Sequence, residues 1–196
     1  MNEFVMYFQM GWQHIVDWGG IDHILFIAAL CAVYLLEDWK RVLVLVTAFT
    51  IGHSITLALS VTNVVFIKSS LIEFLIPVTI AITAFSNVIR KQTVPGKLQI
   101  NYYFAGFFGL IHGMGFSGYL KSLLGTQTNI VRPLLAFNLG LEFGQILIVT
   151  GVLLLAAIVV NIRRVKRRDW SLFLSSAIFG VAFMMAAERY QELMVK

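Results

Sequence analysis

The chain has 196 residues, of which 59% are hydrophobic and only 13% are charged, and its mean hydropathy is +0.83. Soluble domains carry about 25% charged residues, so this composition excludes a soluble globular protein, and one cysteine and three prolines exclude a disulfide scaffold and a proline-rich disordered chain. The formal net charge of +5 comes from basic loops rather than from a nucleic-acid-binding surface.

The remaining class is a polytopic membrane protein, all-α, because no closed barrel fits long continuous apolar runs. A spanning helix takes about 20 residues, so the length allows about six transmembrane helices in a single transmembrane domain over residues 1–196. An N-terminal interfacial helix is expected over residues 4–18, ended by Gly19 and Gly20. The expected spans cover residues 21–36, 42–61, 71–89, 103–121, 133–160 and 171–188. The N-terminus shows neither a basic region nor a small-residue cleavage site. We therefore expect either that no cleaved signal peptide exists or that the sequence is that of a mature chain.

The basic residues predict the orientation of the helices. We call the side of the membrane on which the first span starts face A and the opposite side face B. Ten of the fifteen lysines and arginines fall in face B loops: Lys40, Arg41, Arg90, Lys91, Lys97, Arg163, Arg164, Lys166, Arg167 and Arg168. Short loops rich in Lys and Arg stay in the cytoplasm. Face B is therefore predicted to be cytoplasmic, with both termini outside.

Few polar residues interrupt the spans, and an ionisable residue within a span is a candidate functional residue because its burial is costly. In chain order they are Asp22 and His23 in the first span, Thr50, His53 and Ser54 in the second, Glu73 in the third, His112 in the fourth, and Asn138, Glu142 and Gln145 in the fifth. At 1.5 Å per residue, His53, His112 and Glu142 lie about 14 Å from face A. The polar groups thus converge on the outer half of the membrane.

These side chains are the ligand types that bind a divalent metal ion of intermediate softness. Neutral imidazoles with one or two carboxylates are ligands that Zn²⁺ or Ni²⁺ accepts, with Co²⁺ possible. The predicted metal ligands are His23, His53, His112, Asp22 and Glu142, and the additional candidates are His14 and Glu73. Asn138, Gln145, Ser54 and Thr50 are predicted to orient the imidazoles by hydrogen bonds. Cys31 is a lone thiol, so the soft ligands that Cu(I) prefers are largely missing.

Four stretches carry a resemblance to a known family. Residues 11–26, 47–57, 109–116 and 137–145, which contain His14, His23, His53, His112 and Glu142, resemble the signatures of the HupE/UreJ family of bacterial membrane proteins. The arrangement of His14, Asp22 and His23 is also similar to a His/Asp motif of nickel–cobalt transporters. The resemblance implies a nickel or cobalt permease, a multi-pass protein of the bacterial inner membrane.

The favoured hypothesis is uptake of Ni²⁺ or a related ion from the outer face, because the site opens where an importer captures its ion. The main alternative is a zinc-type intramembrane hydrolase that uses the same histidines and a carboxylate as general base. A metal sensor without turnover is a third reading. Residues 115–118 match the Gly-x-Ser-Gly of rhomboid-type proteases, but the sixth span lacks the histidine such enzymes require. The expected partners are a metal ion, membrane lipid and, in a homo-oligomer, further copies of the chain; nucleic acid is not expected.

Overall fold

The computed structural model describes residues 2–65, 67–90, 98–124 and 130–195, and within these ranges it contains helices and no strands. The seven α-helices are α1 (Glu3–Val16), α2 (Ile21–Cys31), α3 (Trp39–Val61), α4 (Ser69–Ile89), α5 (Leu98–Leu124), α6 (Val131–Ala157) and α7 (Arg167–Val195). Short 3-10 turns at Trp18–Gly20 and Leu36–Asp38 precede α2 and α3, and a π-helical turn at Ile158–Ile162 extends α6. The predicted all-α class is confirmed.

Four helical stretches of the described chain are long and apolar enough to cross a membrane: Leu36–Val61, Ser69–Ile89, Val131–Ile162 and Arg167–Val195. Together α1 and α2 make a fifth candidate, a span broken by a bend of 68°. The helix α5 has 27 residues, but its tyrosines, glycines and histidine lower its apolar character. The structure thus supports four or five apolar spans, and the count of six stays a prediction.

The span expected over residues 21–36 differs from the structure, because α2 ends at Cys31 after 11 residues. A helix of that length is about 16 Å long, roughly half the thickness of the hydrocarbon layer. The backbone then turns, with the amide of Tyr34 donating to the carbonyl of Cys31 at 2.9 Å. The apolar run continues through this turn, and hydropathy alone does not distinguish an apolar turn from a helix.

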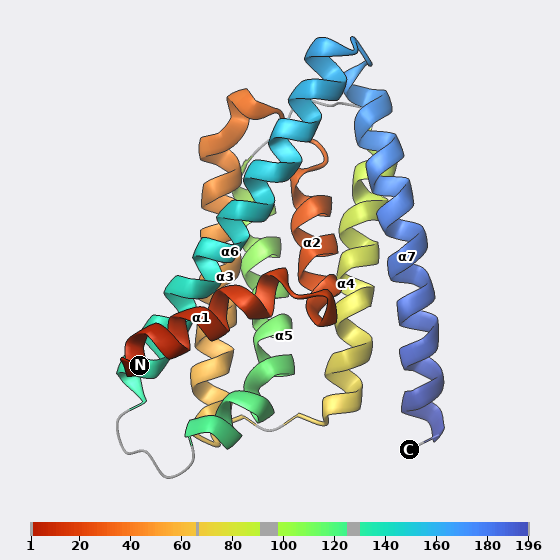
Figure 1. Ribbon diagram of the computed structural model, residues 1–196. Helices are drawn as coiled ribbons and strands as arrows, with labels where there is room; N and C mark the ends of the chain where they lie inside the picture. Colours follow the sequence, from red (N-terminus) through yellow and green to blue (C-terminus); the bar gives the residue numbers. More distant parts are fainter. Residues whose placement is uncertain (1, 66, 91–97, 125–129, 196) are drawn as a thin grey trace.

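The segment expected to be an interfacial helix is helical and packs against the bundle. The side chain of Asn2 caps the start of α1 by accepting from the amide of Phe4 at 3.2 Å. A Cβ at Gly11 would overlap the carbonyl oxygen of Phe137, and one at Gly140 would overlap that of Phe8. These two glycines therefore let α1 lie directly on α6, across the bundle (Figure 1). Whether α1 lies at a membrane interface stays a prediction.

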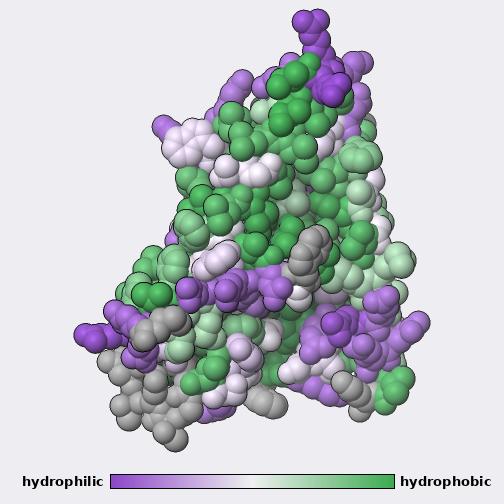
Figure 2. All heavy atoms as spheres, viewed as in Figure 1, coloured by the Kyte–Doolittle hydropathy of each residue, from purple (hydrophilic) through white to green (hydrophobic). Residues whose placement is uncertain are grey.

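The other helices pack in pairs around α2. The most extensive contacts join α3 to α5, α1 to α6 and α4 to α7, while α2 lies among α4, α6 and α7 (Figure 1). Apolar side chains cover much of the visible surface of the bundle, with hydrophilic groups gathered at its top and lower part (Figure 2). This surface is typical of a protein surrounded by lipid over its middle.

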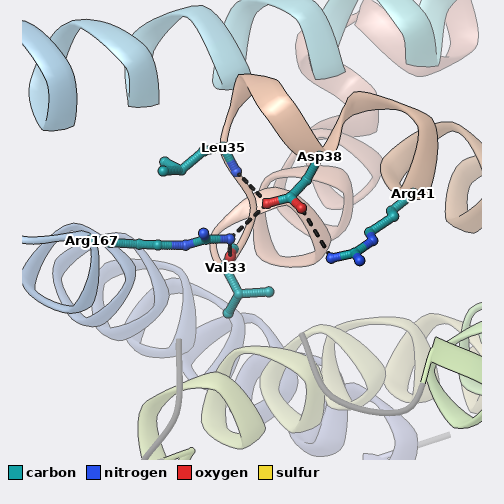
Figure 3. Close-up of polar contacts among 5 residues, drawn as sticks. All are labelled: Val33, Leu35, Asp38, Arg41 and Arg167. Atoms are coloured by element: carbon teal, nitrogen blue, oxygen red, sulfur yellow. Dashed lines mark hydrogen bonds and ion pairs between the residues drawn. The ribbon is translucent and has the colours of Figure 1, made fainter. Parts of the chain in front are cut away.

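A network of ionic contacts fixes the face B end. The guanidinium of Arg167, at the start of α7, donates to the carboxylate of Asp38 at 2.7 Å and to the carbonyl of Val33 at 2.8 Å (Figure 3). Asp38 also accepts from Arg41 at 3.2 Å and from the amide of Leu35 at 3.3 Å. The network ties α7 to the turn between α2 and α3. The basic residues Lys91 and Lys97 of the orientation argument lie outside the described residues.

Candidate metal site

Imidazole rings from four different helices lie together in the bundle. We call them the four-histidine cluster: His14 on α1, His23 on α2, His53 on α3 and His112 on α5. The ring centroid of His23 lies 4.7 Å from that of His14 and 5.3 Å from that of His112. The ring of His53 lies 6.1 Å from His23 and 6.3 Å from His14. The cluster thus joins the three predicted histidine ligands to the additional candidate His14.

Glycines bring these helices close enough for the rings to meet. A Cβ at Gly109 would overlap the carbonyl oxygen of Phe49, and one at Gly113 would overlap that of His53. Because both positions lack a side chain, the backbone of α5 lies directly against α3, which places His112 near His53. The chain turns between α1 and α2 at Gly20, where a side chain would collide with the carbonyl of His14. Gly20, Gly109 and Gly113 therefore permit the close backbone approaches that bring the histidines together.

The carboxylate of Asp22 fixes the tautomer of its neighbour. One oxygen of Asp22 accepts from the backbone amide of His23 at 2.8 Å and lies 2.9 Å from Nδ1 of the same residue. An ionised carboxylate only accepts hydrogen bonds, so Nδ1 of His23 carries the proton and Nε2 carries a lone pair. A carboxylate that holds a histidine in this way is a common second contact behind a metal ligand. Asp22 was predicted to be a metal ligand, and in this structure its carboxylate bonds to His23.

A threonine orients His112 from α4. The hydroxyl of Thr79 donates to the carbonyl of Ile76 at 2.7 Å, and its oxygen lies 3.1 Å from Nε2 of His112. With its only proton used, the hydroxyl accepts from Nε2–H, which leaves a lone pair on Nδ1 of His112. Thr79 is 3% exposed, so this contact is shielded from water.

Buried ring nitrogens in the cluster lack partners. The atoms without a hydrogen bond among the described residues are Nε2 of His14, Nε2 of His23, Nδ1 and Nε2 of His53, and Nδ1 of His112. A buried polar atom left unpaired costs about 1–3 kcal/mol. Five unpaired nitrogens in one cluster indicate that a bound ligand completes the site. Because His23 and His112 each direct a lone pair into the cluster, the ligand is expected to be an electron-pair acceptor such as a metal ion.

The ring spacing suits a shared ion. A ligating nitrogen lies about 2.0–2.1 Å from Zn²⁺, which puts the centroids of two rings around a tetrahedral ion about 5 Å apart. The pairs that His23 forms with His14 and His112, at 4.7 and 5.3 Å, match this spacing. Within the part of the chain that the structure describes, no three His, Cys, Asp or Glu side chains are already placed to hold one ion together. Binding therefore requires the rings to rotate, and His53 has no side-chain hydrogen bond to break.

The cluster opens toward face A. A cavity of about 350 Å³, which we call the face A cavity, includes His14, His23 and His112 in its wall. Three acidic residues line it, namely Asp17, Asp22 and Glu73. Negative charge around a low-dielectric opening concentrates cations there. Glu73, an additional candidate ligand, also forms an exposed ion pair with Arg189 at 3.3 Å.

The predicted ligand Glu142 lies elsewhere, in the contact between α3 and α6. Its carboxylate accepts from the hydroxyl of Thr47 at 2.9 Å, and one turn further along, Gln145 accepts from Thr50 at 2.7 Å. Glu142 does not line the face A cavity. Glu142 and Gln145, three residues apart, share one helix face, and that face is directed at α3.

Among the described residues, the other residues expected to orient imidazoles form no hydrogen bond with a histidine ring. Ser54 donates to the backbone carbonyl of Thr50 at 2.7 Å. Oδ1 of Asn138 and Nε2 of Gln145 are buried without a hydrogen bond among the described residues. Within the described ranges, the side-chain hydrogen bonds to the histidine rings come from Asp22 and Thr79.

Three residues of the site are not among the site residues predicted from the sequence: Thr79, Asp17 and Phe116. The ring of Phe116 lies 4.0 Å from that of His14 and lines the face A cavity. A signal for Thr79 exists in the sequence, because Thr79, Thr83 and Asn87 recur every four residues in an otherwise apolar helix. Asp17 and Phe116 fall within residues 11–26 and 109–116, two of the stretches that carry the family resemblance.

The family model described as HupE / UreJ protein matches residues 1–190, nearly the whole chain. No curated protein and no solved structure matches the chain.

Proposed function

Because the chain belongs to the HupE/UreJ family, we propose that it binds a divalent transition-metal ion, nickel or a related ion, at the four-histidine cluster and carries it across the membrane. The resemblance of the sequence to nickel and cobalt permeases supports the choice of ion. The ligands in this proposal are His14, His23, His53 and His112, with Asp22 behind His23. His14 replaces Glu142 in the proposed ligand set, because the ring of His14 lies in the cluster.

The observation that carries the proposal is the set of five unpaired imidazole nitrogens buried beside a cavity with acidic walls. Neutral imidazole nitrogens suit Ni²⁺, Co²⁺ and Zn²⁺, and carboxylates at the entrance attract the cation before its water is removed. In the proposed orientation, face A is outside, as capture by an importer of the bacterial inner membrane requires.

The test combines metal content with flux. Purified protein is loaded with Ni²⁺ and washed, and bound metal is measured per chain beside ⁶³Ni²⁺ uptake into proteoliposomes. We expect metal to co-purify with the wild type and to be lost in the double variant His53→Ala and His112→Ala. Thr150→Val is the matched control, because among the described residues this exposed hydroxyl bonds only to the carbonyl of Ile146. Metal retained by the double histidine variant refutes the site.

The metal-dependent hydrolase remains the second candidate, favoured by one observation: the carboxylates of Asp17 and Glu73 line the same cavity as the histidines and would serve as general bases. Such an enzyme binds metal without moving it. Bound metal with no ⁶³Ni²⁺ flux in the wild type, accompanied by metal-dependent hydrolysis of a peptide or lipid ester, supports the hydrolase and rejects the carrier.

A further inference from the structure

Beneath the four-histidine cluster, on the side toward face B, three phenylalanine rings form a continuous layer. We call Phe26, Phe49 and Phe108 the phenylalanine floor. The ring centroid of Phe26 lies 4.9 Å from Phe49 and 5.9 Å from Phe108. These side chains are 0%, 1% and 6% exposed. The rings of Phe26 and Phe49 lie 5.0 and 5.2 Å from His112, so the floor touches the cluster directly.

A second cavity lies on the far side of this floor. It has a volume of about 160 Å³, and Phe108 belongs to its wall. The remaining wall includes Tyr34, near the end of α2, and Thr83, Ser86 and Asn87, in the last turns of α4. These segments lie at the face B end of the bundle (Figure 1). We call it the face B cavity.

A line of polar side chains on α4 runs from the four-histidine cluster to the face B cavity. Thr79 contacts His112 of the cluster, and Thr83 and Ser86, four and seven residues later, line the face B cavity. Such spacing keeps the side chains on one face of a helix. The hydroxyl of Thr83 donates to the carbonyl of Thr79 at 2.9 Å, and that of Ser86 to Thr83 at 2.8 Å. Because each hydroxyl proton is used, the oxygen lone pairs stay available to a cation or its water.

We propose that the phenylalanine floor is the closed inner gate of the ion pathway and that the face B cavity is the exit chamber beyond it. This proposal rests on the proposed transport function. A ring of apolar side chains blocks ions by excluding their water, and rotation of the phenylalanine side chains opens it. The ion then passes along the hydroxyl oxygens of α4.

The gate is tested by the accessibility of a cysteine placed beyond it. The protein carries one native cysteine, Cys31, which is buried and is replaced by alanine for this experiment. In that background, Thr83→Cys is exposed to a membrane-impermeant cationic methanethiosulfonate reagent applied to one side of the membrane at a time. We expect labelling from face B and at least tenfold slower labelling from face A. No labelling from face B, or equal labelling from both faces, overturns the proposal.

Removing a ring of the floor gives the second measurement. Adding Phe108→Ala is expected to raise face A labelling of Thr83→Cys at least tenfold. The matched control is Phe107→Ala, because this neighbouring ring is 56% exposed and lies outside the walls of both cavities. Phe108→Leu, a smaller change, replaces the alanine variant if that variant does not fold. Face A labelling that stays at the wild-type rate in the folded variant refutes the gate.

The same preparations separate this inference from the proposed function. Labelling requires no bound metal, so it reports on the gate even if the wild type binds none. Bound Ni²⁺ per chain should be unchanged in Phe108→Ala, since the floor supplies no ligand. If Phe108→Ala loses its metal, the ring of Phe108 belongs to the binding site, and the proposal that it acts only as a gate is wrong.

Discussion

The hydroxyl oxygen of Thr79 lies 3.1 Å from Nε2 of His112, across the contact between α4 and α5. Because the hydroxyl proton goes to the carbonyl of Ile76, Thr79 accepts the ring proton and leaves Nδ1 of His112 free for a ligand. A residue that belongs to none of the sequence motifs thus decides which nitrogen of a motif histidine is available.

Thr79→Val is expected to weaken metal binding about 10–100-fold, the usual cost of losing a contact that orients a ligand. Valine keeps the shape of the side chain but cannot accept the proton of Nε2. Affinity is measured by competition with a chromogenic chelator. Thr150→Val removes a similar hydroxyl far from the histidines and should bind as the wild type does. An unchanged affinity in Thr79→Val contradicts the assigned tautomer.

The comparison of His14→Ala with Glu142→Gln decides the ligand set. The ring of His14 lies in the cluster, whereas Glu142 bonds to Thr47 and lies outside the face A cavity. We expect His14→Ala to lower bound Ni²⁺ at least tenfold and Glu142→Gln to keep full occupancy. Metal content after dialysis against a fixed Ni²⁺ buffer is the measurement. The reverse result restores Glu142 as a ligand and removes His14.

Stability is expected to depend on the contact between Arg167 and Asp38 (Figure 3). The two side chains are only 24% and 15% exposed, and Arg167 also binds the carbonyl of Val33. Truncating one partner of a partly buried, hydrogen-bonded pair costs about 1–3 kcal/mol. Asp38→Ala should therefore lower the thermal midpoint in detergent by several degrees.

The control for this prediction is Glu73→Ala. The pair of Glu73 and Arg189 is about half exposed, at 46% and 45%, and such surface pairs contribute about 0–1 kcal/mol. Its thermal midpoint should stay near that of the wild type. Equal shifts in the two variants would show that the network around Asp38 adds nothing beyond a surface ion pair.

Orientation in the membrane is tested directly. Single cysteines are placed at Val165, between α6 and α7, and at Gln191, near the end of α7, in the Cys31→Ala background. The excess of basic residues at face B predicts that position 165 is labelled only from the cytoplasm and position 191 only from outside. Labelling of position 165 from outside reverses the orientation, and with it the direction of the proposed uptake.

Much of the architecture follows from the sequence alone. The apolar runs predicted an all-helical bundle, and they are helical in the structure, because a chain surrounded by lipid satisfies its backbone polar groups within each helix. The spacing of Glu142 and Gln145 puts them on one helix face, and both side chains bond to hydroxyls of α3. The histidines at positions 23, 53 and 112, singled out for the cost of burying them in a membrane, do lie together.

What only the tertiary structure decided is how each helix is rotated and placed against its neighbours. Spacing along one helix defines which residues share a face, but it does not say which other helix that face meets. The contact of α3 with α6 therefore took Glu142 away from the histidines, and the turn at Gly20 brought His14 to them. The end of α2 at Cys31 and the contact of Thr79 with His112 likewise depend on packing between segments far apart in the chain. The close approach of α5 to α3 at Gly109 and Gly113, which brings His112 to the cluster, depends on packing of the same kind.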